Sequence, residues 1–370
     1  MWQRVLLSAV LVLANSTVLG EQDLEQVKGA DRELTVVSWD GAYVKSQMLG
    51  FIRPYEDKTG VRVNVLQYSG GVDEIRRQVR AWNVHWDLVD LELFDAIRAC
   101  EDGLLVRLDH ESLPAAPDGT PAVKDFINNS LMPCGVGNVV GSTVFSYSRE
   151  RWEKGPERLE DFFDLKRFPG PRGLRRTPQG NLEWALIADG VSPEKVYQVL
   201  STEAGLDRAF DVLNRIKPHI VWWQTGEEAI RLLETEQVAM SSVYSGRVDD
   251  AVERGTPLEI VWDHQVWFYD VWGIPKHGRN IELAKDFLRF ASSTESLAAQ
   301  ATYIPYGPVR QSSMAMLDPE RRKRLPTSKA HLKTAVELNA SWWSDNLERI
   351  APRFERWIER PVMVPKTLPR

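Results

Sequence analysis

The strongest constraint on the fold is an alternation of hydrophobic, β-branched runs with amphipathic segments of helical period. In the first third of the sequence the predicted strands are 34–38, 61–66 and 88–91, and the predicted helices are 46–56, 73–82 and 94–100. Such an alternation favours a parallel sheet with right-handed crossovers. Each helix returns the chain to the end of the sheet where the previous strand began, so the next strand runs in the same direction. We therefore expect an α/β protein.

The same alternation returns in the second half of the sequence. The predicted elements there are a helix at 205–217, a strand at 220–223, a helix at 229–235 behind a capping box at 225–228, and a strand at 238–244. Further helices are predicted at 281–291 and 294–301. At 370 residues the chain is too long for one small core. The runs 135–147 and 268–274 are predicted to cross between two lobes, one formed by 33–141 with 272–308 and the other by 142–271 with 309–370.

The N-terminus is typical of an export signal. Arg4 precedes an apolar run at 5–13, and small residues precede Glu21, so we predict a signal peptide at 1–20 and a polar leader at 21–32. The alternative is a buried N-terminal helix. No later apolar segment reaches the length of a membrane span. The prediction is an exported, periplasmic protein.

Two cysteines remain in this exported chain, Cys100 and Cys134. An even number of cysteines in an oxidising compartment favours a disulfide between them. Two buried thiols are the alternative.

Composition and motifs argue against several function classes. The net charge of −6 gives no basic face for nucleic acid. The six histidines form no H-E-x-x-H pattern, and the sequence has no G-x-S-x-G elbow and no P-loop, so we predict no metal, no cofactor and no enzyme activity. A secreted hydrolase is the alternative from another class, and it would need a nucleophile–base pair that the sequence does not offer.

The segment 238–252 indicates a binding site. A hydrophobic run ends in Tyr244, a small-residue turn follows, and Arg247 lies at the start of an amphipathic helix. Ligands of α/β sheets bind beyond the carboxyl ends of the strands, so these two side chains are expected at the mouth of a cleft. Further along the chain, aromatic residues surround the single carboxylate of Asp270. Aromatic faces around an acid are suited to an organic cation.

Six motifs together resemble the periplasmic solute-binding proteins of ABC importers, and most closely the polyamine-binding branch. They are Leu34-Thr-Val-Val-Ser-Trp-Asp-Gly-Ala-Tyr43, Trp86-Asp-Leu-Val-Asp-Leu91, Ile220-Val-Trp-Trp223, Tyr244-Ser-Gly-Arg247, Trp272-Gly-Ile-Pro275 and Tyr303-Ile-Pro-Tyr-Gly-Pro308. The resemblance covers about 33–360. It implies the two-lobe, type II periplasmic binding fold, a ligand in the interlobe cleft, and a membrane permease as partner of a monomeric receptor.

The resemblance also implies which residues form the pocket. Stacking walls and polar contacts are expected from Trp39, Tyr43, Glu92, Phe94, Glu183, Tyr244, Phe268, Asp270 and Tyr306, with Trp342 or Trp343 capping the cleft. For Trp39, ordinary packing is the alternative. The expected ligand is a putrescine- or spermidine-like polyamine whose ammonium groups meet Glu92, Glu183 and Asp270.

Arg247 keeps a second ligand class open. A guanidinium does not suit a purely cationic ligand, and it could pair with Asp249 or Asp250 at the surface. It could instead receive a ligand carboxylate through a two-pronged hydrogen bond. The alternative ligand is therefore a zwitterion such as an ω-amino acid.

Overall fold

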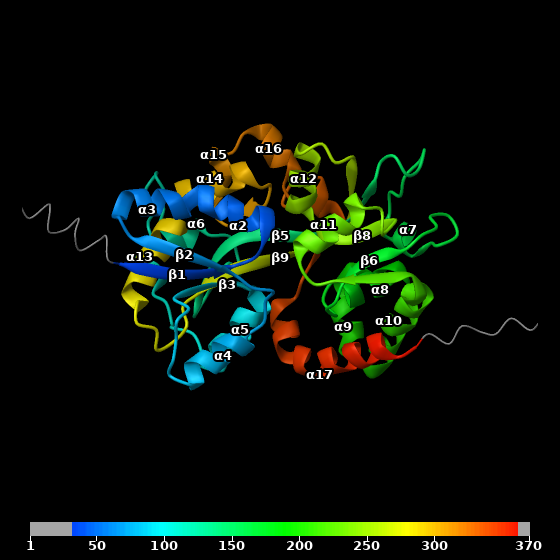
Figure 1. The fold of residues 1–370 in the computed structure, drawn as a ribbon, viewed down its shortest axis with the longest axis horizontal. Coiled ribbons are helices and arrows are strands. Elements are labelled where there is room, and N and C mark those ends of the chain that lie inside the picture. The colour runs from blue at the N-terminus through cyan, green and yellow to red at the C-terminus, as the bar shows by residue number, and fades with distance from the viewer. Residues whose placement is uncertain (1–31, 362–370) are drawn as a thin grey trace, which may run out of the picture.

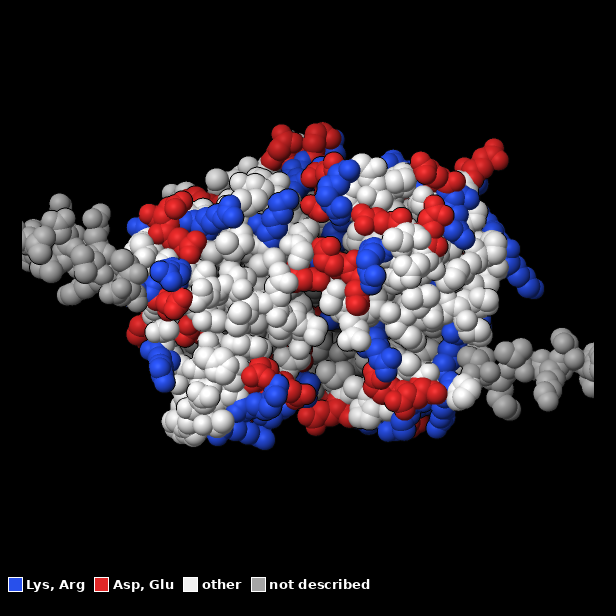
Figure 2. Space-filling model, in the orientation of Figure 1, with Lys and Arg blue, Asp and Glu red and all other residues white. Residues whose placement is uncertain are grey.

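The computed structural model describes residues 32–361 (Figure 1). The predicted signal peptide lies outside these residues, and so does the polar leader except for Arg32. Within 32–361, every helix is too short or too polar to cross a membrane. Charges of both signs are interspersed over the face drawn in Figure 2.

The strands form one mixed sheet of eleven strands. Its main order is β2-β1-β3-β9-β5-β8-β6-β7, with β4 and β10 on β5 and β11 on β9. The bounds are β1 Glu33–Ser38, β2 Arg62–Gln67, β3 Leu88–Glu92, β4 Leu131–Met132, β5 Gly135–Ser148, β6 Arg172–Arg175, β7 Ile220–Trp223, β8 Met240–Tyr244, β9 Leu258–Gly273, β10 Gly307–Pro308 and β11 Val336–Glu337.

Two parallel groups of strands are joined by a long antiparallel pair. Strands β2, β1 and β3 run parallel to one another, and so do β8, β6 and β7. Between the groups, β9 pairs antiparallel with β3 and β5, and β5 pairs antiparallel with β8. Figure 1 shows β5 and β9 running from one group to the other. The α/β fold class is confirmed.

Helices cover both faces of the sheet (Figure 1). Their bounds are α2 Gly41–Gln47, α3 Arg53–Thr59, α4 Asp73–Arg80, α5 Leu93–Glu101, α6 Ala122–Asp125, α7 Leu159–Phe163, α8 Asn181–Ala188, α9 Val196–Leu200, α10 Glu203–Ile216, α11 Gly226–Glu234, α12 Ser245–Glu253, α13 Ile281–Ala291, α14 Thr294–Tyr303, α15 Gln311–Met316, α16 Pro319–Arg324 and α17 Ala340–Glu359. A π-helical turn, Met48–Ile52, joins α2 to α3.

Sequence periodicity predicted most of these elements. The strand 220–223 and the helix 281–291 have the predicted bounds, and Thr225 and Glu228 form the predicted capping box of α11. The expected helix 46–56 is longer and is interrupted by the π-turn. The return strand β9 begins ten residues before the predicted 268, because its first half pairs with β5 although it carries polar residues.

The core divides into two large clusters of buried side chains. One lies around β1, β2 and β3 and includes Phe51 and Phe287, and the other lies around β6 and α8–α10 and includes Phe145 and Trp343. Strands β5 and β9 contribute to both clusters. The lobe boundaries expected from the sequence remain a prediction.

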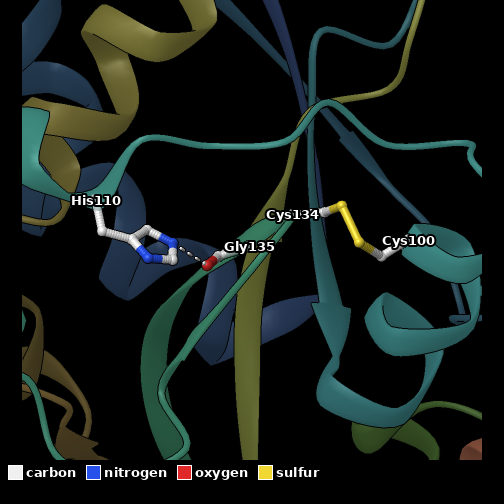
Figure 3. Close-up of a disulfide and its surroundings, with 4 residues drawn as sticks. All are labelled: Cys100, His110, Cys134 and Gly135. Carbon is white, nitrogen blue, oxygen red and sulfur yellow. Dashed lines mark hydrogen bonds between the residues drawn. A yellow bond between two sulfur atoms is a disulfide. The ribbon is translucent and has the colours of Figure 1, made fainter.

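The disulfide between Cys100 and Cys134 is present, as expected, and Figure 3 shows it. It joins the end of α5 to the residue before β5, and the two Cα atoms are 5.7 Å apart. Next to it, the ring Nε2 of His110 lies 3.2 Å from the carbonyl oxygen of Gly135. The disulfide therefore ties the start of β5 to the end of α5.

Candidate ligand-binding site

A cavity lies where the two parallel strand groups face each other. Its walls come from segments across the whole chain. The lining residues are Trp39, Asp40, Tyr43, Tyr68, Ser69, Glu92, Arg175, Gln224, Thr225, Gly226, Tyr244, Arg247, Phe268, Asp270 and Tyr306.

Most polar lining residues stand at the carboxyl ends of strands. Glu92, Arg175 and Tyr244 are the last residues of β3, β6 and β8. Asp40 follows β1, and Gln224 follows β7. The two parallel groups point their carboxyl ends toward the junction between them, where α/β sheets bind their ligands.

Aromatic rings form the walls of the cavity. Trp39 stacks on Tyr68 with ring centres 5.0 Å apart and planes 29° apart. The ring centre of Tyr43 lies 5.6 Å from that of Tyr306, and Tyr244 meets Phe268 edge-on at 5.7 Å. These faces can enclose methylene groups and attract a cation.

Arg175 and Glu92 form a two-pronged ion pair in the wall. The Nη1 and Nη2 atoms of Arg175 donate to the two carboxylate oxygens of Glu92 at 2.8 and 3.2 Å. Both side chains are largely buried. The nearby Glu92 carboxylate raises the pKa of the Arg175 guanidinium, although burial acts against it. The negative charge of Glu92 is therefore already neutralised by Arg175.

Arg247 is buried beside the first turn of α11. Its Nη2 lies 2.7 Å from Oδ1 of Asp40, and its Nη1 lies 3.5 Å from Oε1 of Glu227. Its Nε has no hydrogen-bond partner. A guanidinium carries five N–H donors, so Arg247 keeps several for a ligand. The predicted surface pairing with Asp249 or Asp250 does not occur, since those acids bond Arg324 and Arg254.

A glycine makes room for this guanidinium. A Cβ placed on Gly226 would lie 2.0 Å from Nε of Arg247, closer than two atoms can approach. Gly226 is the first residue of α11. The guanidinium can therefore lie against the helix N-terminus only because the side chain there is missing.

Asp270 is the lining carboxylate without a cationic partner in the described chain. It lies directly opposite Glu92 in the β3–β9 register. Its Oδ1 accepts no hydrogen bond. Burial, followed by the charges of Asp90 and Glu92, raises the pKa of Asp270 well above its usual range. Such a group would gain from a cation placed against it.

Three of the predicted pocket residues do not line this cavity. Phe94 packs into the second core cluster. Trp342 lies against Tyr197 and donates from Nε1 to Ser201 Oγ. In this structure both side chains contact other parts of the protein and not the cavity.

Glu183 also lies away from the cavity and has a structural role. Its carboxylate accepts from the backbone N–H of Gly180 at 2.8 Å, from the Tyr197 hydroxyl at 2.9 Å and from Trp343 Nε1 at 2.6 Å. It caps α8 and anchors α17, so it has no free oxygen to offer a ligand. Burial raises the pKa of Glu183.

Sequence reasoning missed Arg175, Asp40 and Tyr68. Strand β6 has only four residues, two of them arginines, and gives no hydrophobic run that would predict a strand end. Asp40 and Tyr68 each follow a predicted strand by one or two residues, and that position was a usable signal. In the described residues no group of three or more His, Cys, Asp or Glu could hold a metal ion.

Sequence similarity to known proteins assigns the chain to a family. Residues 50–327 match the family of bacterial extracellular solute-binding proteins, and the chain belongs to that family. It is 34% identical to a γ-aminobutyric acid-binding protein of Pseudomonas aeruginosa over 94% of this chain and 97% of the relative. It is 22% identical to a spermidine/putrescine-binding periplasmic protein of Salmonella typhimurium, over 84% of this chain and 87% of the relative.

A solved structure supports the fold assignment. The ABC transporter substrate-binding protein of Bradyrhizobium japonicum superposes with a TM-score of 0.79 at 30% identity, covering 89% of this chain and all of that one. The two-lobe, type II periplasmic binding fold expected from the sequence is thereby confirmed.

Proposed function

We propose that this chain captures a short ω-amino acid, of the class of γ-aminobutyrate, and delivers it to an ABC permease. The capture takes place in the periplasm after removal of the signal peptide, and the ligand leaves chemically unchanged. The relative that binds γ-aminobutyric acid and the relative named as part of an ABC transporter support this proposal.

The balance of charges in the cavity carries the proposal. Two guanidinium groups and three carboxylates line it. Arg175 neutralises Glu92, and Arg247 faces Asp40 with donors to spare. Two groups keep unused binding capacity. Asp270 has no cationic partner in the cavity, and Arg247 has N–H donors without acceptors. An ammonium at Asp270 and a carboxylate at Arg247 would complete both, with methylenes between the aromatic walls.

A polyamine is the second candidate, favoured by the spermidine/putrescine-binding relative. Putrescine carries two ammonium groups and would need two open carboxylates. Glu92 is held by Arg175, and Glu183 lies outside the cavity, so the second ammonium would face guanidinium groups. Repulsion between like charges in a poorly solvated site costs several kcal/mol by order of magnitude, so the polyamine ranks lower.

The ion pairs in the cavity also support two lobes that close around the ligand. Glu92 and Asp40 belong to one strand group, and Arg175 and Arg247 to the other, so both ion pairs span the cavity. We infer that β5 and β9 carry the hinge and that closing the lobes brings these partners together.

Titration calorimetry with four related compounds tests the proposal. γ-Aminobutyrate should bind, while butyrate, butylamine and putrescine, each lacking one feature of the zwitterion, should bind at least about thirtyfold more weakly, since each lost charged pair costs roughly 2–5 kcal/mol. In Arg247→Met the preference for γ-aminobutyrate over butylamine should vanish. Putrescine binding more tightly than γ-aminobutyrate would overturn the assignment in favour of the polyamine.

A further inference from the structure

Four charged side chains form a cluster between α12 and α16, which lie next to each other in Figure 1. Arg324 of α16 donates from Nε to Oδ1 of Asp249 at 2.9 Å and from Nη2 to Oε1 of Glu253 at 2.9 Å. The Nη1 atom of Arg321 lies 3.7 Å from Oδ2 of Asp249 and 3.6 Å from Oε1 of Glu253. The two acids are one helical turn apart, so both face α16. All four residues lie outside the cavity lining.

Helix α16 is fixed to α14, which contributes to the core cluster around β1, β2 and β3. Leu317 and Leu325, the residues that flank α16, are buried in a cluster with Ala301 of α14. Arg321 donates from Nε to the carbonyl oxygen of Ala301 at 2.7 Å and from Nη2 to that of Thr302 at 2.9 Å. Its side chain is only 12% exposed. The arginines of α16 are therefore held on a firm support.

Helix α12 packs on the other strand group. Val248 and Ala251 are buried in a core cluster that includes residues of β8. The first turn of α12 also lies close to the segment between α14 and β10, where a Cβ on Gly246 would be 2.7 Å from side-chain atoms of Ile304 and Tyr306. The cluster with α16 and this close approach both set the position of α12 relative to α14.

Arg247 and Asp249 lie on different sides of α12. Two positions along an α-helix correspond to a rotation of about 200°. Accordingly, Arg247 points to Asp40 and the cavity, and Asp249 points to α16. Burial raises the pKa of the Asp249 carboxyl, and the neighbouring Arg324 acts against this rise. A poorly solvated carboxylate needs a charged partner, so this side of α12 is held to α16.

We propose that Arg321 and Arg324 are positioning residues for Arg247. By holding Asp249 and Glu253 they fix α12, and the guanidinium in its first turn then lies where a ligand carboxylate can meet it. The inference rests on the proposed function, in which Arg247 receives that carboxylate. Hydrogen bonds weaken steeply with poor distance and angle, so a binding group needs support from the residues behind it.

Removing the charge of Arg324 should weaken only the recognition of the ligand carboxylate. In Arg324→Gln, calorimetry should show γ-aminobutyrate binding about tenfold more weakly, as when supporting contacts behind other binding groups are lost. Butylamine has no carboxylate and should bind as it does to the parent, so the preference for γ-aminobutyrate should fall by the same factor. Arg324→Lys keeps the charge and should restore most of the preference. Glu253→Gln changes the cluster from the side of α12 and should lower the preference in the same direction.

Arg254→Gln is the matched control. Arg254 also pairs with two acids, Asp250 at 3.0 Å and Glu234 at 3.4 Å, but these lie on α12 itself and on α11 of the same strand group. This variant should keep the preference of the parent. Equal losses for γ-aminobutyrate and butylamine in Arg324→Gln, or an equal change of preference in the control, would overturn the positioning role.

Hydrogen exchange of the empty protein separates this inference from the proposed ligand. The backbone amides of α12 should exchange faster in Arg324→Gln than in the parent, because the helix loses its support on α16. Unchanged exchange would also overturn the positioning role. If the parent does not bind γ-aminobutyrate while the exchange difference is present, the proposed ligand is wrong and the support of α12 by α16 stands.

Discussion

Arg175 donates from both of its Nη atoms to the two oxygens of Glu92, at 2.8 and 3.2 Å, and so joins the end of β6 to the end of β3 across the cavity. The two residues are 83 positions apart in the sequence. This pair and the Arg247–Asp40 pair leave Asp270 as the lining carboxylate without a cationic partner among the described residues.

Removing one partner of this pair should weaken ligand binding. Glu92→Gln keeps the shape but leaves a buried guanidinium unpaired whenever the cavity closes, so calorimetry should show a loss on the order of 2–5 kcal/mol. Glu348→Gln is the control, because its pair with Arg98 is exposed and should matter by less than about 1 kcal/mol. Equal affinities in the two variants would mean that the cavity closes without this pair.

Neutralising Asp270 should separate binding from stability. Asp270→Asn should cost γ-aminobutyrate on the order of 2–5 kcal/mol of binding free energy, because the ammonium loses its partner. The empty protein should lose little stability or gain some, because a buried carboxylate without a counter-ion is removed. Calorimetry and urea unfolding measure the two effects. Unchanged affinity would place the ammonium elsewhere.

A substitution at Gly226 tests, by steric overlap alone, whether Arg247 contacts the ligand. In Gly226→Ala the new methyl would overlap Nε of Arg247, so the guanidinium must move and γ-aminobutyrate should bind at least about tenfold more weakly, which corresponds to about 1.4 kcal/mol. Stability should not fall from helix propensity, since alanine favours a helix over glycine. Gly278→Ala is the matched control, because its Cβ would meet only ordinary contacts from 3.6 Å outward. An identical response of both variants would argue against Arg247 as a ligand contact.

The disulfide should stabilise the first group of helices and strands. It joins residues separated by 34 positions, and in the chain-entropy model a loop of this size contributes about 3–4 kcal/mol. Replacing Cys100 and Cys134 together with serine should lower the unfolding free energy by up to that amount and leave ligand affinity nearly unchanged. Titration of the denatured, unreduced parent should detect no free thiol, and two reactive thiols would contradict the bond.

Local pattern was enough to predict the architecture. Strands with β-branched residues and helices with period 3.6 follow from side-chain geometry alone, so the elements around Thr225 and Ile281 were predicted closely. Residues that follow a strand were also predictable as cavity residues, because strand ends meet at one edge of the sheet. Trp39 and Tyr244 lie at strand ends and line the cavity, whereas Tyr43 reaches it from α2 and Asp270 from within β9.

The sequence by itself therefore determined the α/β class, the strand ends and most of the aromatic walls of the cavity. Only the tertiary structure decided which charges neutralise one another. Glu92 became a partner of Arg175, Glu183 became a helix cap, and Asp270 was left without a counter-ion. The reason is physical: hydrophobic periodicity is a property of neighbours along the chain, whereas an ion pair depends on distances of a few ångströms between residues that the sequence holds far apart.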